Sequence, residues 1–234
     1  MAQSAAESAA RPALSIIVPM LDEAAGLPRF LDELREILGA GEEVLFVDGG
    51  SSDASVALVR AAGFTVCETP RGRALQMNAG AAQASAQALL FLHADTRLPL
   101  GFASAVQGAL AQGACWGRFD IDLVGRSPLL GVVAAFMNLR SRLTGIATGD
   151  QAIFVRRETF AALGGYPEQP LMEDVELSRR LRRLSAPACL RLKVASSGRR
   201  WDERGAWRTI CLMWRLRWSY WRGVSAEELA RRYS

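Results

Sequence analysis

The first half of the chain alternates short, apolar, β-branched runs with segments of helical periodicity, and this alternation restricts the fold more than any other feature. The apolar runs carry no charged residue, which is typical of strands buried on both faces of a sheet. They lie at residues 14–19, 44–47, 64–67 and 88–92. The helical segments between them are residues 27–38, 53–62 and 73–84. A β-α-β-α-β-α-β order predicts an α/β fold, a Rossmann-like, mostly parallel sheet with helices on both faces.

The second half is less regular and continues with both kinds of element. The predicted strands are residues 114–122, 151–156 and 187–196, and the predicted helices are 128–142 and 174–184. A chain of 234 residues, half of them hydrophobic, can bury a large core, which excludes a disordered or disulfide-framework protein. Three segments are predicted: a disordered polar tail at 1–12, one domain at 13–203, and an amphipathic C-terminal helical extension at 204–234.

Nothing in the sequence predicts a membrane span or a secretion signal. The polar start of the chain lacks the basic and apolar regions of a signal peptide. The longest strongly apolar run, residues 128–139, is shorter than the ~20 residues that a spanning helix needs. The four cysteines form no Cys-x-x-Cys pair, which argues against a zinc ribbon and favours a reducing compartment. We therefore expect a cytoplasmic protein.

The net charge of +4 is unevenly distributed along the chain. Residues 1–176 contain 13 basic and 20 acidic side chains, a net charge of −7. Residues 177–234 contain 15 basic and 4 acidic side chains, a net charge of +11. A carboxylate-rich body indicates metal or acid–base chemistry, and a cationic C-terminal part favours an anionic partner.

Two of the predicted strands end at acidic residues. Asp48 ends the second strand, and His93 and Asp95 follow the fourth. Ligands of parallel sheets bind at the carboxyl ends of the strands, so these side chains are candidates for one site. A carboxylate there suits a hard divalent cation that leaves positions open for phosphate oxygens. The alternatives are that the acids cap loops and that His93, the only histidine, is structural.

Asp174 is the most informative acidic residue, because it begins an amphipathic helical pattern. The leucines that share its helical face are Leu177, Leu181 and Leu184. Glu173 and Glu176 lie off that face, and Glu176 can pair with Arg180 four residues later. A carboxylate on an inward face needs a partner or a task, and general-base catalysis is such a task. The alternative is a helix N-cap.

Two arginines flank a glycine at the start of the third predicted helix. Arg71 and Arg73 stand on either side of Gly72. Cations beside the free N–H groups of a helix start indicate an anion site. The sequence contains neither Gly-x-Gly-x-x-Gly nor a P-loop motif, which argues against a dinucleotide-binding protein and against a P-loop protein.

Six segments, taken in order, resemble the family 2 glycosyltransferases of the GT-A fold. They are IIVPMLDEAAGL, EVLFVDGGSSD, GRALQMNAGA, LLFLHADTRLP, TGDQAIFVRRETFAALGGYPE and MEDVELSRRLRR, and the resemblance runs from about residue 14 to residue 200. Within that family, HADT, WGRFDI and the C-terminal part are similar to a bacterial subgroup, the arsenosugar-biosynthesis-type glycosyltransferases. The resemblance implies a GT-A fold with additional C-terminal helices.

The resemblance also implies donor-binding roles for individual residues. Pro19, Asp22 and Glu23 correspond to the first nucleotide-binding loop, where the family commonly has Asn-Glu. Asp48 matches the carboxylate that recognises the nucleobase, and Gly49 follows it where the family often has a second Asp. The nucleotide phosphates would pass Arg71 and Arg73. The remaining residues expected to bind the nucleotide sugar are Asn78, His93, Ala94, Asp150, Gln151 and Glu173.

The family motifs further imply a metal ligand and a catalytic base. His93-Ala94-Asp95 occupies the Asp-x-Asp motif, so Asp95 is expected to bind a divalent cation, Mn²⁺ or Mg²⁺. Asp174 matches the catalytic Asp of the Glu-Asp motif. The implied reaction is the metal-dependent, inverting transfer of a hexose from a UDP- or GDP-linked donor to the hydroxyl of an unknown acceptor. No nucleic acid is expected as a partner.

Two other functions remain open from the residues alone. A nucleotidyltransferase also needs a metal and a nucleotide, and it would release pyrophosphate. A non-catalytic module that binds nucleotides or nucleic acid would use the cationic C-terminal part, but it gives the carboxylates no role. A glycosyltransferase releases a nucleoside diphosphate, so the released product distinguishes the three.

The C-terminal extension projects its tryptophans on one helical stripe. That stripe contains Trp207, Cys211, Trp214, Trp218 and Trp221, and a second stripe contains Arg208, Arg215 and Arg222. Tryptophan beside arginine is typical of a helix that lies on a membrane surface, here the inner face of the membrane. The alternatives are packing on the domain and the seam of a homodimer.

Overall fold

The computed structural model describes residues 12–233, without the side chains of six residues near the C-terminus (Arg200, Glu203, Arg204, Ala206, Trp207 and Tyr233). The disordered tail predicted at 1–12 therefore lies outside the described residues, apart from its last one. The α/β class predicted from the sequence is confirmed.

Eight strands within the described residues form one sheet in the order β3-β2-β1-β4-β7-β6-β8-β5. They are β1 (Leu14–Met20), β2 (Glu42–Asp48), β3 (Thr65–Glu68), β4 (Ala88–Phe91), β5 (Thr96–Arg97), β6 (Trp116–Val124), β7 (Phe154–Arg156) and β8 (Ala188–Ser197). The pairs among β3, β2, β1 and β4 are parallel, as is the pair β6–β8. β7 is antiparallel to both of its neighbours, and β5 is antiparallel to β8.

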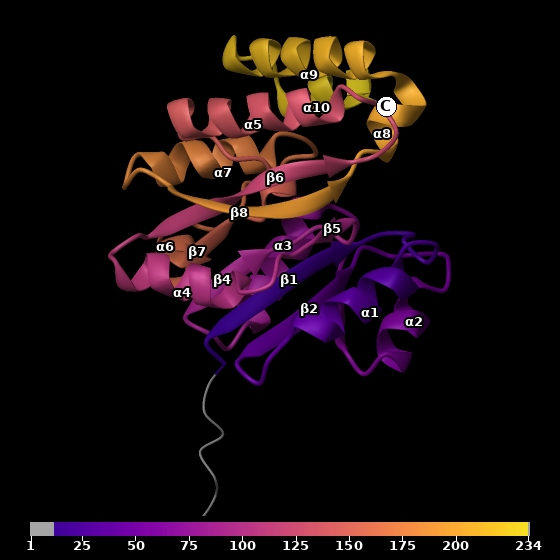
Figure 1. Ribbon diagram of the computed structural model, residues 1–234, viewed down its shortest axis with the longest axis vertical. Coiled ribbons are helices and arrows are strands. Elements are labelled where there is room, and N and C mark those ends of the chain that lie inside the picture. Colours follow the sequence, from indigo (N-terminus) through magenta and orange to yellow (C-terminus); the bar gives the residue numbers. More distant parts are fainter. Residues whose placement is uncertain (1–11, 234) are drawn as a thin grey trace, which may run out of the picture.

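The helices cover both faces of this sheet, and Figure 1 shows α5, α9 and α10 together at one end of the molecule. They are α1 (Leu27–Ile37), α2 (Ser55–Ala61), α3 (Arg73–Gln83), α4 (Phe102–Ala111), α5 (Leu130–Thr144), α6 (Arg157–Ala162), α7 (Glu173–Arg182), α8 (Arg199–Arg204), α9 (Ala206–Trp221) and α10 (Ala226–Tyr233). A 3₁₀ helix, η1, spans Gly149–Gln151.

Two hydrophobic clusters lie on opposite faces of the sheet. Along β1, Ile16 and Val18 join one cluster, with side chains from α1, α2, α4 and α5. Ile17, between them, joins the other cluster, with side chains from α3, α6 and α7. Successive residues of a strand point to opposite faces, so a strand covered on both sides needs an unbroken apolar run. This packing explains the β-branched sequence at 14–19.

Several predicted boundaries are wrong, for local reasons. Gln151 was expected in a strand, but it ends η1, where it forms a capping box with Thr148. Leu184 lies beyond the end of α7 and is 56% exposed, so it is not part of the inward face. Asp53 stands before α2 and accepts the N–H of Ala24 from the neighbouring loop at 2.9 Å. The sequence patterns assigned no element to β5, α4, α6 or α8.

The C-terminal helices pack against the domain. Leu216 of α9 and Leu229 of α10 form a small hydrophobic cluster with Met172, the residue before α7. The hydroxyl of Tyr220 on α9 lies 3.4 Å from Oε2 of Glu176 on α7. No helix in the described part of the chain is both long and apolar enough to cross a membrane.

Candidate active site

A cleft of about 400 Å³ opens at the carboxyl ends of β1 and β4 and is closed on its other sides by η1, α7 and α9. Nine of the residues predicted to form the site line it: Pro19, Glu23, Arg73, His93, Ala94, Asp95, Asp150, Glu173 and Asp174. They come from five separate stretches of the chain. The fold thus brings most of the predicted donor-binding residues together with the predicted base and metal ligand.

Asp174 is held at the start of α7 by two backbone N–H groups. Gly149 donates to Oδ2 at 2.8 Å, and Val175 donates to Oδ1 at 2.7 Å. Gly149 itself lies against His93, because a Cβ at Gly149 would be only 2.5 Å from Nε2 of the imidazole. The base candidate and the residue at the end of β4 are therefore linked through one glycine.

Glu173, which was expected off the inward face of the helix, is 3% exposed. Burial raises the pKa of its carboxyl group, and the neighbouring charge of Asp174 raises it further. Arg73 opposes this effect from the start of α3, with Nη1 at 3.4 Å from Oε1 of Glu173. Glu176 is also buried, and it pairs with Arg180 at 3.0 Å as predicted. Tyr220 of α9 lies against Glu176, and Arg73 of α3 lies against Glu173.

The Asp95 end of the cleft has the donors for a divalent cation that also binds phosphate. Burial raises the pKa of Glu23, and the nearby charge of Asp95 adds to the rise. His93 lines the same cleft. No group of three or more His, Cys, Asp or Glu side chains among residues 12–233 could hold a metal alone. Mg²⁺ typically binds through one or two carboxylates together with substrate phosphates, and this residue set fits that mode.

Asp150 and Arg140 place buried charges behind the base. Oδ1 of Asp150 is buried and has no hydrogen-bond partner among the described residues. Burial raises the pKa of Asp150, the hydrogen bond from Thr148 lowers it, and the charge of Asp174 raises it again. Burial lowers the pKa of Arg140, an effect that the charges of Asp150 and Asp174 oppose. Asp174 therefore has a second carboxyl group and a buried guanidinium nearby.

The loops after β1 and β2 are tied together by the residues predicted to bind the nucleotide. Oδ1 of Asp22 accepts the N–H of Ser52 at 2.7 Å, and the N–H of Asp22 donates to Oγ of Ser51 at 2.9 Å. Asp48 is 3% exposed, and its Oδ2 accepts the N–H groups of Gly50 and Ser51. Neither aspartate lines the cleft itself. Both tie down the loops that follow β1 and β2, the first of which carries Glu23 into the cleft.

The other four predicted residues lie away from the cleft wall. Gly49 packs against the side chain of Gln76, because a Cβ at position 49 would lie only 3.0 Å from Cδ of Gln76. Asn78 uses its amide on the backbone of Tyr166, donating at 2.9 Å and accepting at 2.8 Å. Gln151 is fully buried, and Arg71 is exposed. Gly49, Asn78 and Gln151 therefore contact neighbouring protein groups and do not line the cleft.

Left-handed backbone at non-glycine residues occurs next to the cleft. Within residues 12–233 it is found at Asp22, Ala152 and Met172, with φ of 52°, 48° and 64°. Each lies within two residues of a cleft carboxylate, Glu23, Asp150 or Asp174. Aspartate tolerates this conformation better than most residues, whereas alanine and methionine are strained in it. Such strain persists only where the surrounding structure imposes it, and it clusters at functional sites.

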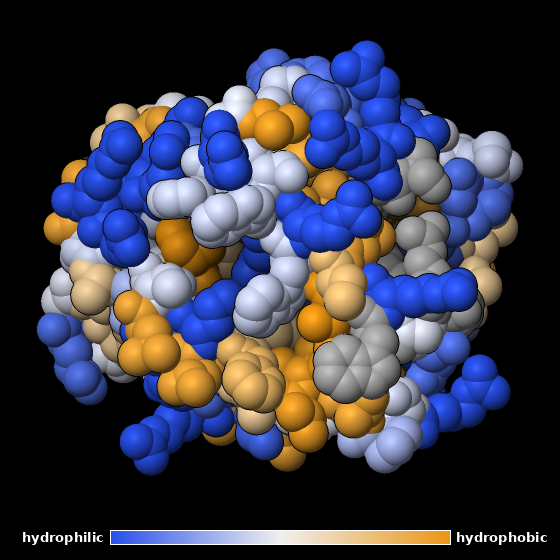
Figure 2. Space-filling view, turned by 90° about the horizontal axis from the view of Figure 1, so that it is seen from above, coloured by the Kyte–Doolittle hydropathy of each residue, from blue (hydrophilic) through white to orange (hydrophobic). Residues whose placement is uncertain are grey.

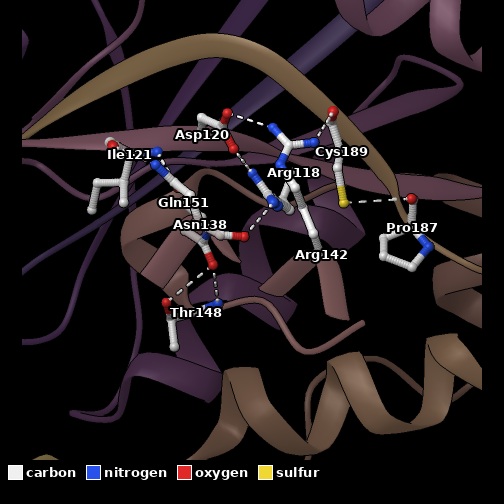
Figure 3. Close-up of polar contacts among 9 residues, drawn as sticks. All are labelled: Arg118, Asp120, Ile121, Asn138, Arg142, Thr148, Gln151, Pro187 and Cys189. Atoms are coloured by element: carbon white, nitrogen blue, oxygen red, sulfur yellow. Dashed lines mark hydrogen bonds and ion pairs between the residues drawn. The ribbon is translucent and has the colours of Figure 1, made fainter. Parts of the chain in front are cut away.

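A layer of polar side chains links β6 to α5 (Figure 3). Arg118 is fully buried and donates to Asp120, which also accepts from Arg142. Asn138 of α5 donates to the carbonyl of Ile121 at 2.9 Å and accepts its N–H at 2.8 Å. A buried arginine needs a carboxylate partner, and Asp120 supplies one for two arginines.

The C-terminal residues that line the cleft were not among the predicted site residues. The residues missed are Arg199, Trp201, Met213, Leu216 and Arg217. Met213, Leu216 and Arg217 lie on the inward face of α9, opposite its exposed tryptophans. Only the alternative in which this helix packs on the domain could have pointed to them.

This arrangement of sheet, helices and acidic cleft is the GT-A fold of glycosyltransferases, as solved structures show. The mannosyltransferase PcManGT from Pyrobaculum calidifontis, in complex with GDP-Man and Mn²⁺, matches with a TM-score of 0.61 at 19% identity, over 80% of this chain and 57% of that one. TarS 1-349 of S. aureus, in complex with UDP-GlcNAc, matches with a TM-score of 0.64 at 15% identity, over 79% of this chain and 58% of that one.

Sequence comparison points to the same class of protein. Residues 15–130 match the family model of glycosyl transferase family 2. An uncharacterized glycosyltransferase of Mycobacterium tuberculosis is 34% identical over 167 residues, 66% of this chain. The chain spans 63% of the length of that relative.

Proposed function

We propose that the protein is a metal-dependent, inverting glycosyltransferase that moves a hexose from a nucleoside-diphosphate sugar to a hydroxyl group. The observation that carries this proposal is the placement of Asp174. Its carboxylate lines the same cleft as Asp95, Glu23 and His93, and a backbone N–H holds one of its oxygens at 2.8 Å.

Asp174 is the general base of the proposed reaction. The N–H groups of Gly149 and Val175 fix the orientation of the carboxylate and leave lone pairs on both oxygens. One of these can take the proton of the acceptor hydroxyl as that oxygen attacks the anomeric carbon. The C–O bond to the nucleoside diphosphate breaks in the same displacement, so the configuration inverts and no enzyme nucleophile is required.

Asp95, with Glu23 beside it, would hold a divalent cation together with the donor diphosphate. When bound, Mn²⁺ or Mg²⁺ supplies Lewis-acid stabilisation of the negative charge that develops on the leaving group. Arg73 and Arg199 line the same cleft and add positive charge for the phosphates. The complexes of structural relatives with GDP-Man and with UDP-GlcNAc support a nucleotide-sugar donor for this chain as well.

Donor binding and turnover test the proposal separately. We expect one nucleotide sugar of a panel to raise the melting temperature, and to raise it more with Mn²⁺, because a ligand that binds only the folded state stabilises it. Asp174→Asn is expected to keep this shift and to lose ~10²–10⁴-fold in turnover, the usual contribution of a general base. Glu158→Gln, an exposed acid in the first turn of α6, is the matched control.

The released product separates the proposed reaction from the alternatives. A nucleoside diphosphate is expected, whereas pyrophosphate would indicate a nucleotidyltransferase. Wild-type turnover in Asp174→Asn would reject the assignment of the base.

A further inference from the structure

Helix α9 has two apolar faces, and only one of them packs on the protein. Leu216 is buried, and Met213, Leu216 and Arg217 line the cleft. On the other face, Trp214 is 73%, Trp218 58% and Trp221 76% exposed. The rings of Trp218 and Trp221 lie 5.1 Å apart, centroid to centroid. Burying a side chain of this size is strongly favourable, so three exposed tryptophans in one stripe indicate a surface that is covered in use.

Helix α5 adds an aliphatic and aromatic stripe at the same end of the molecule (Figure 1). Its outward side chains follow helical spacing, and those more than half exposed are Val132, Phe136, Leu139 and Leu143. Met137 of α5 and Ile210 of α9 both pack against the same hydrophobic cluster. Figure 2 looks down on this end and shows hydrophobic side chains gathered on one part of the face, beside hydrophilic ones. We call the exposed side chains of α5 and α9 the α5–α9 face.

The charges of α9 favour a lipid surface over a second copy of the chain. Arg208 and Arg215 on α9 and Arg222 at its end are exposed, and α9 contains no acidic residue. A two-fold dimer through this face would bring arginines against arginines, which is unfavourable. An anionic lipid surface accepts tryptophan at the level of the headgroups and pairs with each nearby arginine, worth about 1 kcal/mol per basic residue.

We propose that the α5–α9 face docks on an anionic membrane surface. Aromatic and aliphatic side chains enter the interface, and the arginines contact the headgroups. Because Met213, Leu216 and Arg217 form the other side of the same helix, docking places one wall of the cleft directly above the lipid. This proposal concerns a surface outside the acidic site, so its test does not depend on turnover.

Flotation of the full chain with lipid vesicles tests the proposal. We expect the wild type to float with vesicles of phosphatidylcholine and phosphatidylglycerol, and far less with phosphatidylcholine alone. Trp214→Ser/Trp218→Ser/Trp221→Ser is expected to lower the bound fraction at least tenfold. Phe136→Ser/Leu143→Ser on α5 is also expected to lower the bound fraction. Leu100→Ser/Leu184→Ser, which removes two equally exposed leucines outside both helices, is the matched control and is expected to float like the wild type.

The variants replace exposed side chains, and their melting temperatures check that they fold. Equal flotation of all variants, or no flotation of the wild type, would overturn the proposal. So would a wild type that elutes as a dimer and becomes monomeric in the tryptophan variant, because the face would then be occupied by a second copy.

Discussion

Replacing Gly149 with alanine tests whether catalysis depends on the close approach of this backbone to His93. A Cβ at Gly149 would lie 2.5 Å from Nε2 and 2.8 Å from Cε1 of the imidazole, whereas ordinary contact begins at 3.4 Å. The two groups must therefore separate by 3.4 − 2.5 = 0.9 Å. Since the N–H of Gly149 also holds Oδ2 of Asp174 at 2.8 Å, the shift displaces either the imidazole or the base.

The expected effect on the rate is large compared with the effect on stability. A misplacement of about 1 Å in a catalytic arrangement costs roughly 10²-fold in rate, or about 2.7 kcal/mol of transition-state stabilisation. Overpacking by one methyl group typically destabilises the folded state by ~1–3 kcal/mol. We therefore expect Gly149→Ala to remain folded, with a lower melting temperature and ~1% of the wild-type turnover.

The assay is the release of nucleoside diphosphate at saturating donor, followed together with thermal unfolding. Gly108→Ala in α4 is the matched control, because a Cβ there meets nothing within 4 Å. It is expected to gain ~0.5–1 kcal/mol of stability, as alanine is the better helix former, and to leave turnover unchanged. A Gly149→Ala enzyme with wild-type turnover would refute the link between His93, Gly149 and Asp174.

Three further predictions concern buried groups. Burial raises the pKa of Asp150, so the folded protein favours the protonated form of this carboxyl group. This preference adds fully to the stability below the ordinary aspartate pKa, and the added stability is lost as the pH rises through the raised pKa. Asp150→Asn should therefore increase the free energy of unfolding by ~1 kcal/mol near pH 8, and by much less near pH 4, in chemical denaturation. Asp120→Asn leaves Arg118 buried without a carboxylate partner and should lower the free energy of unfolding by ~3–5 kcal/mol. Asp122→Asn, at an exposed position of the same strand, should change it by less than ~0.5 kcal/mol. Equal melting temperatures of the two variants would contradict this prediction. Gly80→Ala places a Cβ 2.5 Å from Cγ2 of Ile17, so the free energy of unfolding should fall by ~1–3 kcal/mol in thermal unfolding. An unchanged melting temperature would contradict this.

The first half of the fold could be predicted because both faces of its strands are covered. In β1, Ile16 and Ile17 enter different clusters, so the strand appears in the sequence as a continuous apolar run. The carboxyl ends of such strands meet along one edge, which is why a ligand site was expected at Asp48, His93 and Asp95. His93 and Asp95 line the cleft and Asp48 does not, whereas Glu23 was implied only by the family resemblance.

The boundaries near η1 and α7 could not be predicted in the same way. Gln151 stands in an apolar stretch but ends a 3₁₀ turn, because its side chain caps Thr148. Glu173 and Glu176 follow the pattern of an exposed helix face but are buried, Glu173 beside Arg73 of α3 and Glu176 beside Tyr220 of α9. Helical periodicity describes one element at a time, whereas burial here depends on a distant element that packs over it.

The cleft wall formed by α9 has a consequence for protein synthesis. Translation proceeds at ~5–20 residues per second, so β1 to β4 leave the ribosome about ten seconds before α9 does. Pro19, Glu23 and Asp95 belong to the part synthesised first, whereas Met213, Leu216 and Arg217, which line the same cleft, are synthesised later. The wall of the cleft in a nascent chain is therefore complete only when α9 has been synthesised.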